Sequence, residues 1–254
     1  MSDQDRDNPR REFLRKSLTL IPVVTVASTG LGSSMLAAAP ETAAPARPVA
    51  SGKLPSGSQN YEPSYFSAEE WAFIKAAVER LIPADEMGPG ALEAGVPEYI
   101  DRQMNTPYAA GALWYMQGPF KADAAPEMGW QSKLVPKDIY RLGIAAVDAW
   151  CKDLKGQVFA AQDSATRDDM LRRLEAGGSE VTAHFDAVPP KIFFNLLLQN
   201  TKEGFFCDPI HGGNKGMVGW TMIGFPGARA DFMDWVERNE QYPFPAVSIR
   251  GQRA

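Results

Sequence analysis

Apolar residues recur at helical spacing along much of this chain, and start or stop signals accompany them. Ser67 and Glu70 form a capping-box pattern, because each side chain can bond a free backbone N–H group at the start of a helix. Pro83 ends the helix that this box predicts. Between them, five apolar side chains share one helical face: Trp71, Ile74, Val78, Leu81 and Ile82.

Further segments show the same pattern. Helices are predicted from Val96, from Pro107 through Met116 after the cap Thr106, from Pro136, over Phe159–Leu174 with Gly177 and Gly178 as a stop, and after Pro189-Pro190. The run Ile192–Leu198 is apolar nearly all round, which predicts the central buried helix. No hairpin signal lies between alternating runs. The predicted fold is therefore all-α, a single irregular domain of five to seven helices with a Gly/aromatic-rich C-terminal loop region.

The N-terminus carries an export pattern. Arg10 and Arg11, one spacer, then Phe13 and Leu14 match the twin-arginine motif. A weakly apolar stretch over residues 18–36 follows, and Ala37–Ala39 offers a cleavage site, so residues 1–39 are predicted to be a twin-arginine signal peptide. A retained anchor and a chance Arg-Arg pair are the alternatives. The prediction places the chain in the periplasm, exported by the twin-arginine translocase.

The remaining chain divides by composition. Residues 40–60 are rich in Pro, Ala, Ser and Gly, and are predicted to be a flexible linker. Residues 61–254 show no internal repeat and are predicted to fold as one domain.

Charge and ligand counts restrict the chemistry. The chain has 26 basic and 31 acidic residues, a net charge of −5 without a Lys/Arg stripe, which argues against nucleic-acid binding. Two Cys and two His leave few ligands for zinc, haem or an iron–sulfur cluster. No dinucleotide, P-loop or haem-attachment motif is present. Because twin-arginine export usually serves proteins that fold around a cofactor, a chain without a cofactor site is predicted to escort a cofactor-loaded polypeptide.

Residues 204–227 form an unusual segment with seven glycines and interleaved large apolar side chains. Each glycine costs a helix about 1 kcal/mol relative to Ala, so an irregular structure is predicted. The apolar side chains need a surface to pack on. Two alternatives follow, which are compatible with each other: the segment packs on its own helical domain, or it packs on another protein.

Three sets of polar residues could carry chemistry. His211 with Asp208 is a candidate general base, but turn formation or interface hydrogen bonding is the favoured interpretation of His211, because Asp208 is only a neighbour in sequence. Cys151 and Cys207 are either a disulfide, as an oxidising compartment allows, or two free thiols, which folding before export favours. A set of acidic residues is interpreted as solvated helix ends: Asp85, Glu86, Glu98 and Asp101.

The sequence resembles subunit 3, the small or gamma subunit, of gluconate 2-dehydrogenase and related sugar dehydrogenases such as fructose dehydrogenase. The resemblance covers most of residues 61–254. It is carried by Leu81–Asp85, Gly90–Asp101 and Ile139–Ile144, and most specifically by Leu198–Phe206 running into Gly212–Trp220 and Ile223–Arg229. The glycines, aromatics and Asn214 of that last block match in order.

The resemblance implies a non-catalytic subunit without a cofactor of its own. Its partners would be a large flavoprotein of the glucose–methanol–choline type, which holds FAD, and a multihaem cytochrome c or iron–sulfur subunit that passes electrons to membrane quinone. The partner interface implied in this chain comprises Trp220, Phe225, Arg229 and Trp235, with Asn214 ordering the loop. The substrate contacts would lie in the other chain.

Two other hypotheses compete with this one. The first is an autonomous periplasmic enzyme centred on His211 and Asp208. The second is a stand-alone helical binding protein that has no partner subunit.

Overall fold

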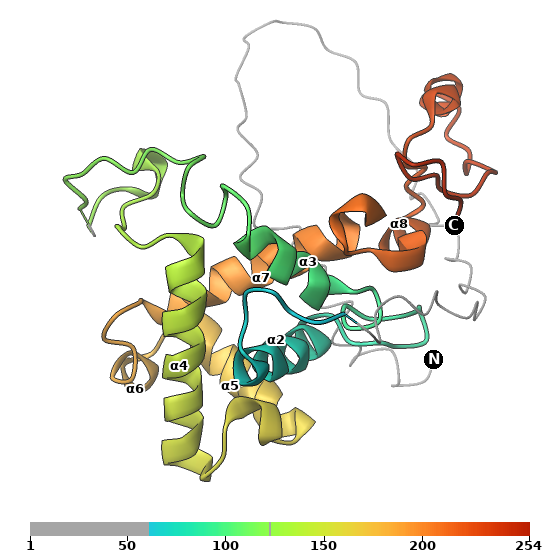
Figure 1. The fold of residues 1–254 in the computed structure, drawn as a ribbon. Coiled ribbons are helices and arrows are strands. Elements are labelled where there is room, and N and C mark those ends of the chain that lie inside the picture. Colours follow the sequence, from blue (N-terminus) through green and yellow to red (C-terminus); the bar gives the residue numbers. More distant parts are fainter. Residues whose placement is uncertain (1–60, 122) are drawn as a thin grey trace, which may run out of the picture. The chain divides into compact units, whose positions relative to one another are not determined.

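The computed structural model describes residues 61–121 and 123–254, which belong to one compact unit (Figure 1). The predicted signal peptide (1–39) and linker (40–60), with Arg10, Arg11, Phe13 and Leu14, lie outside the described residues. The α-helices are α2 (Ala68–Leu81), α3 (Val96–Met104), α4 (Pro136–Lys155), α5 (Ser164–Ala176), α6 (Ser179–Thr182), α7 (Pro190–Phe206) and α8 (Val218–Ile223). The short 3₁₀ helices are η3 (Pro126–Met128), η4 (Phe159–Ala161), η5 (Pro209–His211), η6 (Lys215–Met217) and η7 (Ala230–Trp235).

The described residues contain isolated β-bridges but no strand, so the prediction of an all-α fold is confirmed. The predicted central helix is also confirmed. α7, orange in Figure 1, contacts α2, α3, α4, α5 and α8. It buries side chains on several faces, as an apolar run without a polar stripe requires.

Aromatic rings join the helices around α7. The ring centroid of Phe73 on α2 lies 4.8 Å from that of Phe159 and 6.0 Å from that of Phe193 on α7. Tyr140 on α4 meets Phe193 edge to face at 6.1 Å. Phe73, Phe159, Phe193 and Tyr140 are all 0% exposed. Truncating a ring of this kind to Ala typically costs about 3–5 kcal/mol, so this cluster is a main source of stability.

Local signals place most helix ends correctly. The Ser67 hydroxyl accepts a hydrogen bond from the Glu70 N–H group, and the Glu70 carboxylate accepts one from the Ser67 N–H group. This capping box is therefore present as predicted. The Phe159–Leu174 helix is instead split, because Asp163 caps a new start at Ser164. Gly177, in the left-handed region, ends α5 as predicted.

The helix predicted from Pro107 to Met116 is wrong. The structure has turns there, in a loop that extends away from the helices in Figure 1. Gly111 adopts φ +69°, which interrupts an α-helix. Leu113 and Tyr115 are 74% and 78% exposed, so these two large side chains are not buried as a packed amphipathic helix would require. Trp114 packs on Trp130 across the loop at 4.8 Å between ring centroids.

An N-terminal strap, residues 61–66, lies across α3 and is fixed by Asp101. This carboxylate is 0% exposed. It accepts hydrogen bonds from the Tyr61 hydroxyl, from the N–H and hydroxyl groups of Ser64, and from the N–H groups of Tyr65 and Phe66. Because hydrogen bonds to a charged acceptor are stronger than neutral ones, this carboxylate fixes the irregular strap to α3.

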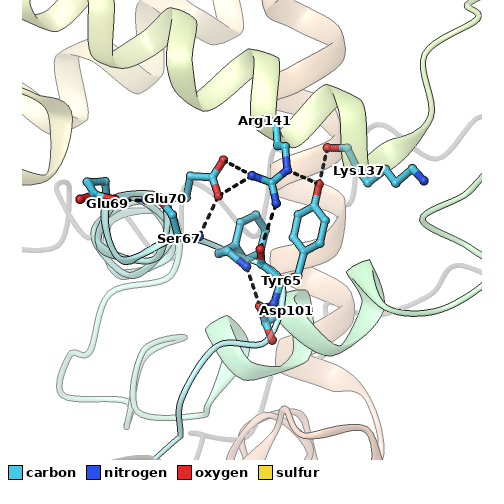
Figure 2. A network of polar contacts seen from close by, with 8 residues as sticks. Tyr65, Ser67, Glu69, Glu70, Asp101, Lys137 and Arg141 are labelled. Atoms are coloured by element: carbon cyan, nitrogen blue, oxygen red, sulfur yellow. Dashed lines mark hydrogen bonds and ion pairs between the residues drawn. The ribbon is translucent and has the colours of Figure 1, made fainter.

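Arg141 ties the same strap to two helices, as Figure 2 shows. From α4 its guanidinium donates to the Glu70 carboxylate on α2 and to the hydroxyl and carbonyl oxygens of Tyr65. The Tyr65 hydroxyl donates to the carbonyl oxygen of Lys137 at 2.8 Å. The start of the domain is thus bonded to α2, α3 and α4.

Two of the acids interpreted as solvated helix ends are buried, and that interpretation is wrong for them. Asp101 holds the strap. Glu98 is 6% exposed and forms ion pairs with Arg102 and Lys215. Their burial is a tertiary effect, because both lie on the face of α3 that other segments cover. Within residues 61–121 and 123–254, none of the helices combines the length and apolarity that crossing a bilayer demands.

Candidate partner interface

Asn214 organises the glycine-rich loop after α7. It is 0% exposed and adopts φ +45°, a conformation that Asn tolerates better than most residues. Its side-chain amide donates to the Cys207 carbonyl oxygen and accepts from the Gly219 N–H group, both at 2.8 Å. One side chain therefore joins the end of α7 to the start of α8.

The loop also lies very close to α7. A Cβ atom on Gly213 would come within 2.1 Å of the Gly204 carbonyl oxygen, so any other residue would push the loop off the helix. The Lys215 N–H group donates to the Ala94 carbonyl oxygen just before α3. The glycines of this segment thus serve close packing, which the sequence left open as one of its two alternatives.

Trp220 on α8 is a packed side chain. It is 6% exposed, and its indole N–H group donates to the Phe206 carbonyl oxygen at 2.6 Å. It forms a small core with Met217 and Ala246. Phe225 meets its ring edge to face at 5.1 Å and is itself 45% exposed. The indole is a buried support beneath the exposed Phe225 ring.

The C-terminal segment, residues 228–254, folds back on the end of α8. The Ala228 N–H group donates to the Val247 carbonyl oxygen at 2.7 Å, and the Val247 N–H group donates to the Pro226 carbonyl oxygen at 3.1 Å. The Ile249 N–H group donates to the Asp208 carboxylate at 2.8 Å. The segment, dark red in Figure 1, is therefore bonded to both sides of the glycine-rich loop.

Arg229 and Trp235 belong to an aromatic cluster within this segment, with Phe232, Tyr242 and Phe244. The Arg229 guanidinium donates twice to the Pro245 carbonyl oxygen and lies over the rings of Tyr242 and Phe244, 5.8 and 5.5 Å from their centroids. The Tyr242 ring meets Phe232, Trp235 and Phe244 at centroid distances of 5.3–5.7 Å. Cation–π contacts of this kind hold an aromatic cluster together at a protein surface.

Exposed apolar side chains concentrate in this region. Of the ten large hydrophobic side chains that are exposed in the described residues, six lie between residues 223 and 249. We call these six the C-terminal apolar surface: Ile223, Phe225, Met233, Val236, Phe244 and Ile249. Exposed apolar residues held in place by a bonded scaffold are typical of a protein–protein contact rather than of a hinge.

The candidate base His211 lies at an open pocket of about 500 Å³. Its walls are Tyr99 and Gln103 of α3, Glu203 and Phe206 of α7, and the loop residues Cys207, Asp208 and His211. Both Asp208 oxygens accept backbone N–H groups, those of Ile210 and Ile249. Among the described residues, no hydrogen bond joins the side chains of His211 and Asp208. A base that is oriented by a carboxylate needs such a bond.

The two cysteines, for which the sequence allows a bridge or free thiols, are free in this structure. Cys151 is buried on α4 and Cys207 caps α7. Burial raises the pKa of each thiol to about 12. Both are therefore neutral near pH 7, which is the unreactive form. No group of three His, Cys, Asp or Glu side chains in the part of the chain that is described is placed to hold a metal ion.

Comparison with known families adds one finding. Residues 68–227, which include α2 to α8, match the family described as gluconate 2-dehydrogenase subunit 3. The chain belongs to this family. No curated protein and no solved structure matches it.

The residues that match the subunit 3 family include part of the candidate interface. Asn214, Trp220 and Phe225 lie inside the matched residues, whereas Arg229 and Trp235 lie just beyond them. Asn214, Trp220 and Phe225 lie in the glycine-rich loop, on α8 and directly after it, whereas Arg229 and Trp235 lie in the aromatic cluster of the C-terminal segment. The structure packs Asn214 and Trp220 inside and leaves Phe225 half exposed.

The sequence does not predict the pocket, nor that the C-terminal segment bonds to both sides of the glycine-rich loop. The pocket joins residues from α3 and α7 that lie about a hundred positions apart, as in the 3.4 Å hydrogen bond from Tyr99 to Glu203. The large apolar residues after Gly227 indicate that this segment packs on the domain, because a solvated tail is typically poor in such residues. Nothing in a single sequence indicates that Asp208 would bond to Ile249.

Proposed function

We propose that this chain is the non-catalytic small subunit of a periplasmic, membrane-associated dehydrogenase that oxidises gluconate or a related sugar. Its role is to escort and structurally support a flavoprotein subunit. Membership in the gluconate 2-dehydrogenase subunit 3 family supports a role as a subunit of such a complex. The observation that supports the role of this chain is the C-terminal apolar surface, which lies on segments held by hydrogen bonds from Asn214, Trp220 and Arg229.

In this proposal the redox chemistry belongs to the other subunits. A flavoprotein of the glucose–methanol–choline type binds FAD, which accepts the hydride from the alcohol carbon of the substrate. A multihaem cytochrome c or an iron–sulfur subunit then carries the electrons to membrane quinone. The twin-arginine leader, with Arg10 and Arg11, sends the folded complex to the periplasm.

The interface follows from the exposed side chains. Phe225 and the aromatic cluster around Arg229 and Trp235 would contact the flavoprotein directly. Trp220 and Asn214 would act from beneath, by fixing α8 and the loop before it. Aromatic and Arg side chains dominate binding energy at such interfaces when they become fully desolvated.

A pull-down of the tagged native protein tests this proposal. The expected result is a flavin absorbance spectrum in the eluate and a flavoprotein identified by mass. Phe225→Ser combined with Phe244→Ser should remove the flavoprotein. Leu113→Ser combined with Tyr115→Ser is the matched control, because these side chains are even more exposed but lie on the other loop. A native chain that elutes alone, as a soluble monomer without flavin, would show that the proposal is wrong.

A further inference from the structure

Residues 228–245 form a loop whose two ends are bonded together, and we call this loop the aromatic arm. At its base, the Ala228 N–H group donates to the Val247 carbonyl oxygen at 2.7 Å. Next to it, two nitrogens of the Arg229 guanidinium donate to the Pro245 carbonyl oxygen, at 3.2 and 2.9 Å. In Figure 1 the arm is the red loop that extends beyond α8. Because these bonds lie at the base, they close the loop independently of the residues at its tip.

The tip of the arm is built from its own side chains. Three rings pack edge to face around the Tyr242 ring, those of Phe232, Trp235 and Phe244. The Tyr242 hydroxyl donates to the Asp231 carboxylate at 2.7 Å. In the part of the chain that the structure describes, the ring contacts and hydrogen bonds of residues 230–244 all have partners within the arm. None of the residues of η7 is buried, so the tip of the arm adds little to the core of the domain.

The arm presents large apolar side chains to solvent. Met233, Val236 and Phe244 are 76%, 60% and 52% exposed, and they make up half of the C-terminal apolar surface. Compact surface loops that are packed by their own side chains often carry function. An ordered loop that exposes several large apolar side chains is typical of a surface that another molecule covers.

The arm is also acidic. It contains four carboxylates and two guanidinium groups, which gives it a net charge of −2: Asp231, Asp234, Glu237, Glu240, Arg229 and Arg238. The Arg229 guanidinium is bonded within the arm, and Arg238 lies over the Trp235 ring at 4.5 Å. The carboxylates of Asp234, Glu237 and Glu240 are on exposed residues and form no ion pair in the described part of the chain. Acidic side chains thus alternate with the exposed apolar ones along residues 233–240.

The charge of the arm restricts what can cover it. A second copy of the same arm would bring like charges together, and so would an anionic lipid surface. A protein surface with apolar pockets and a basic rim would instead be complementary to the arm in both respects.

We infer that the aromatic arm is a self-contained recognition element that docks on an apolar, basic-rimmed surface of the flavoprotein subunit. Met233, Val236 and Phe244 enter that surface, and the exposed carboxylates of the arm face its basic rim. The domain core folds without the tip of the arm. The inference rests on the proposed function for the identity of the partner, whereas the independence of the arm from the core rests on its own contacts.

Removing the tip of the arm tests whether it is self-contained. Residues 230–244 are replaced by two glycines, which leaves Arg229 and Pro245 to close the base. We expect a Tm within about 3 °C of the wild type, because the removed residues pack on one another rather than on the core. Capture of the flavoprotein should fall about ten-fold or more. A variant that is unfolded, or that melts more than about 10 °C lower, would place the arm in the core and overturn the inference.

Point variants of the full chain test the apolar contact without shortening the loop. Met233→Ser combined with Val236→Ser should raise the dissociation rate constant of the flavoprotein about ten-fold or more, because contact area is lost from the bound state. Leu113→Ser combined with Tyr115→Ser, which removes two exposed apolar side chains outside the arm, is the control and should leave that rate constant unchanged. Equal dissociation rates for the two double variants would overturn the inference.

A charge reversal tests the basic rim. Asp234→Lys combined with Glu237→Lys should lower the association rate constant about ten-fold at low salt, and the difference should largely vanish at about 0.5 M NaCl. Glu175→Lys combined with Asp186→Lys makes the same charge change at exposed positions outside the arm and is the control. An association rate that falls equally in both double variants, or in neither, would overturn the charge match.

The outcomes distinguish this inference from the proposed function. If the wild-type chain and the chain without the tip of the arm capture the flavoprotein equally well, the proposed function stands and the inference is wrong. If the wild-type chain captures no flavoprotein, both are wrong. Capture by the wild type that the shortened arm and both double variants of the arm weaken, while their controls do not, is the result that the inference predicts.

Discussion

Replacing Trp220 by Ala separates a supporting role from a direct contact. The side chain is 6% exposed, packs with Met217 and Ala246, and donates its indole N–H group to the Phe206 carbonyl oxygen. Truncation of a buried aromatic residue costs about 3–5 kcal/mol of unfolding free energy. For a domain of this size, that corresponds to a fall in Tm of roughly 6–20 °C.

Two further substitutions separate the contributions of the indole hydrogen bond and of the neighbouring Phe225 ring to the free energy of unfolding. Trp220→Phe keeps most of the apolar ring but removes the donor to the Phe206 carbonyl oxygen, so we expect a loss of about 1–3 kcal/mol. Phe225→Ala removes a ring that is 45% exposed, so we expect a loss of only about 1 kcal/mol. Phe225→Ala should nevertheless weaken capture of the flavoprotein as much as Trp220→Ala does.

The assay is urea unfolding of the purified chain, followed by far-UV circular dichroism, with Tm from calorimetry as a second readout. Flavoprotein capture is measured on the same preparations. A Tm of the Trp220→Ala variant within about 2 °C of the wild type would refute the reasoning. Loss of capture with that unchanged Tm would instead make Trp220 a contact residue that the partner covers.

Three further predictions concern buried polar groups. Asp101→Asn should cost at least about 2 kcal/mol, because an amide cannot accept all the donors of the strap, as urea unfolding would show. Burial acts to raise the pKa of Asp101, but the strap's hydrogen bonds outweigh it and leave that pKa below its usual value. Its stabilisation should thus be full above about pH 4 and fade as the pH falls further, a dependence that Asp101→Asn flattens. Asn214→Ala should cost about 2–4 kcal/mol and Asn214→Gly less, since Gly keeps the left-handed backbone, and melting curves distinguish them. Without reductant, Cys151 and Cys207 should both react with iodoacetamide in urea and neither in buffer at pH 7.5, as mass spectrometry would record; an unreacted pair in urea would indicate a bridge.

Local chemistry explains why the helices were largely predictable. The Ser67–Glu70 box, Pro136 and Gly177 each act within one helical turn, so neighbouring residues contain the information. The apolar run of α7 predicts its central position, because a helix without a polar stripe has to be enclosed. The turns at residues 107–116 show the limit of this reasoning. A cap and a proline start a helix only if an apolar face can then be buried.

The site was predictable only in part. The glycine and aromatic pattern of residues 204–227 indicates a packed irregular segment, and the structure places Asn214 at its centre. The sequence cannot indicate that Trp220 lies beneath Phe225, because both are large aromatic residues in one loop. Asp101 and Glu203 acquire their environments from segments far along the chain. Hydrogen bonds between polar groups far apart in the chain leave no periodic pattern in the sequence, so they cannot be predicted from it.

Dye reduction by the separately expressed chain tests the central claim most directly. The claim is that this subunit supplies structure while its partner supplies redox chemistry. The account predicts no gluconate-dependent or sugar-dependent dye reduction by the purified chain alone, and activity once the flavoprotein is added. Turnover by the chain alone, abolished by His211→Ala in a variant that still folds, would contradict it and favour an autonomous enzyme.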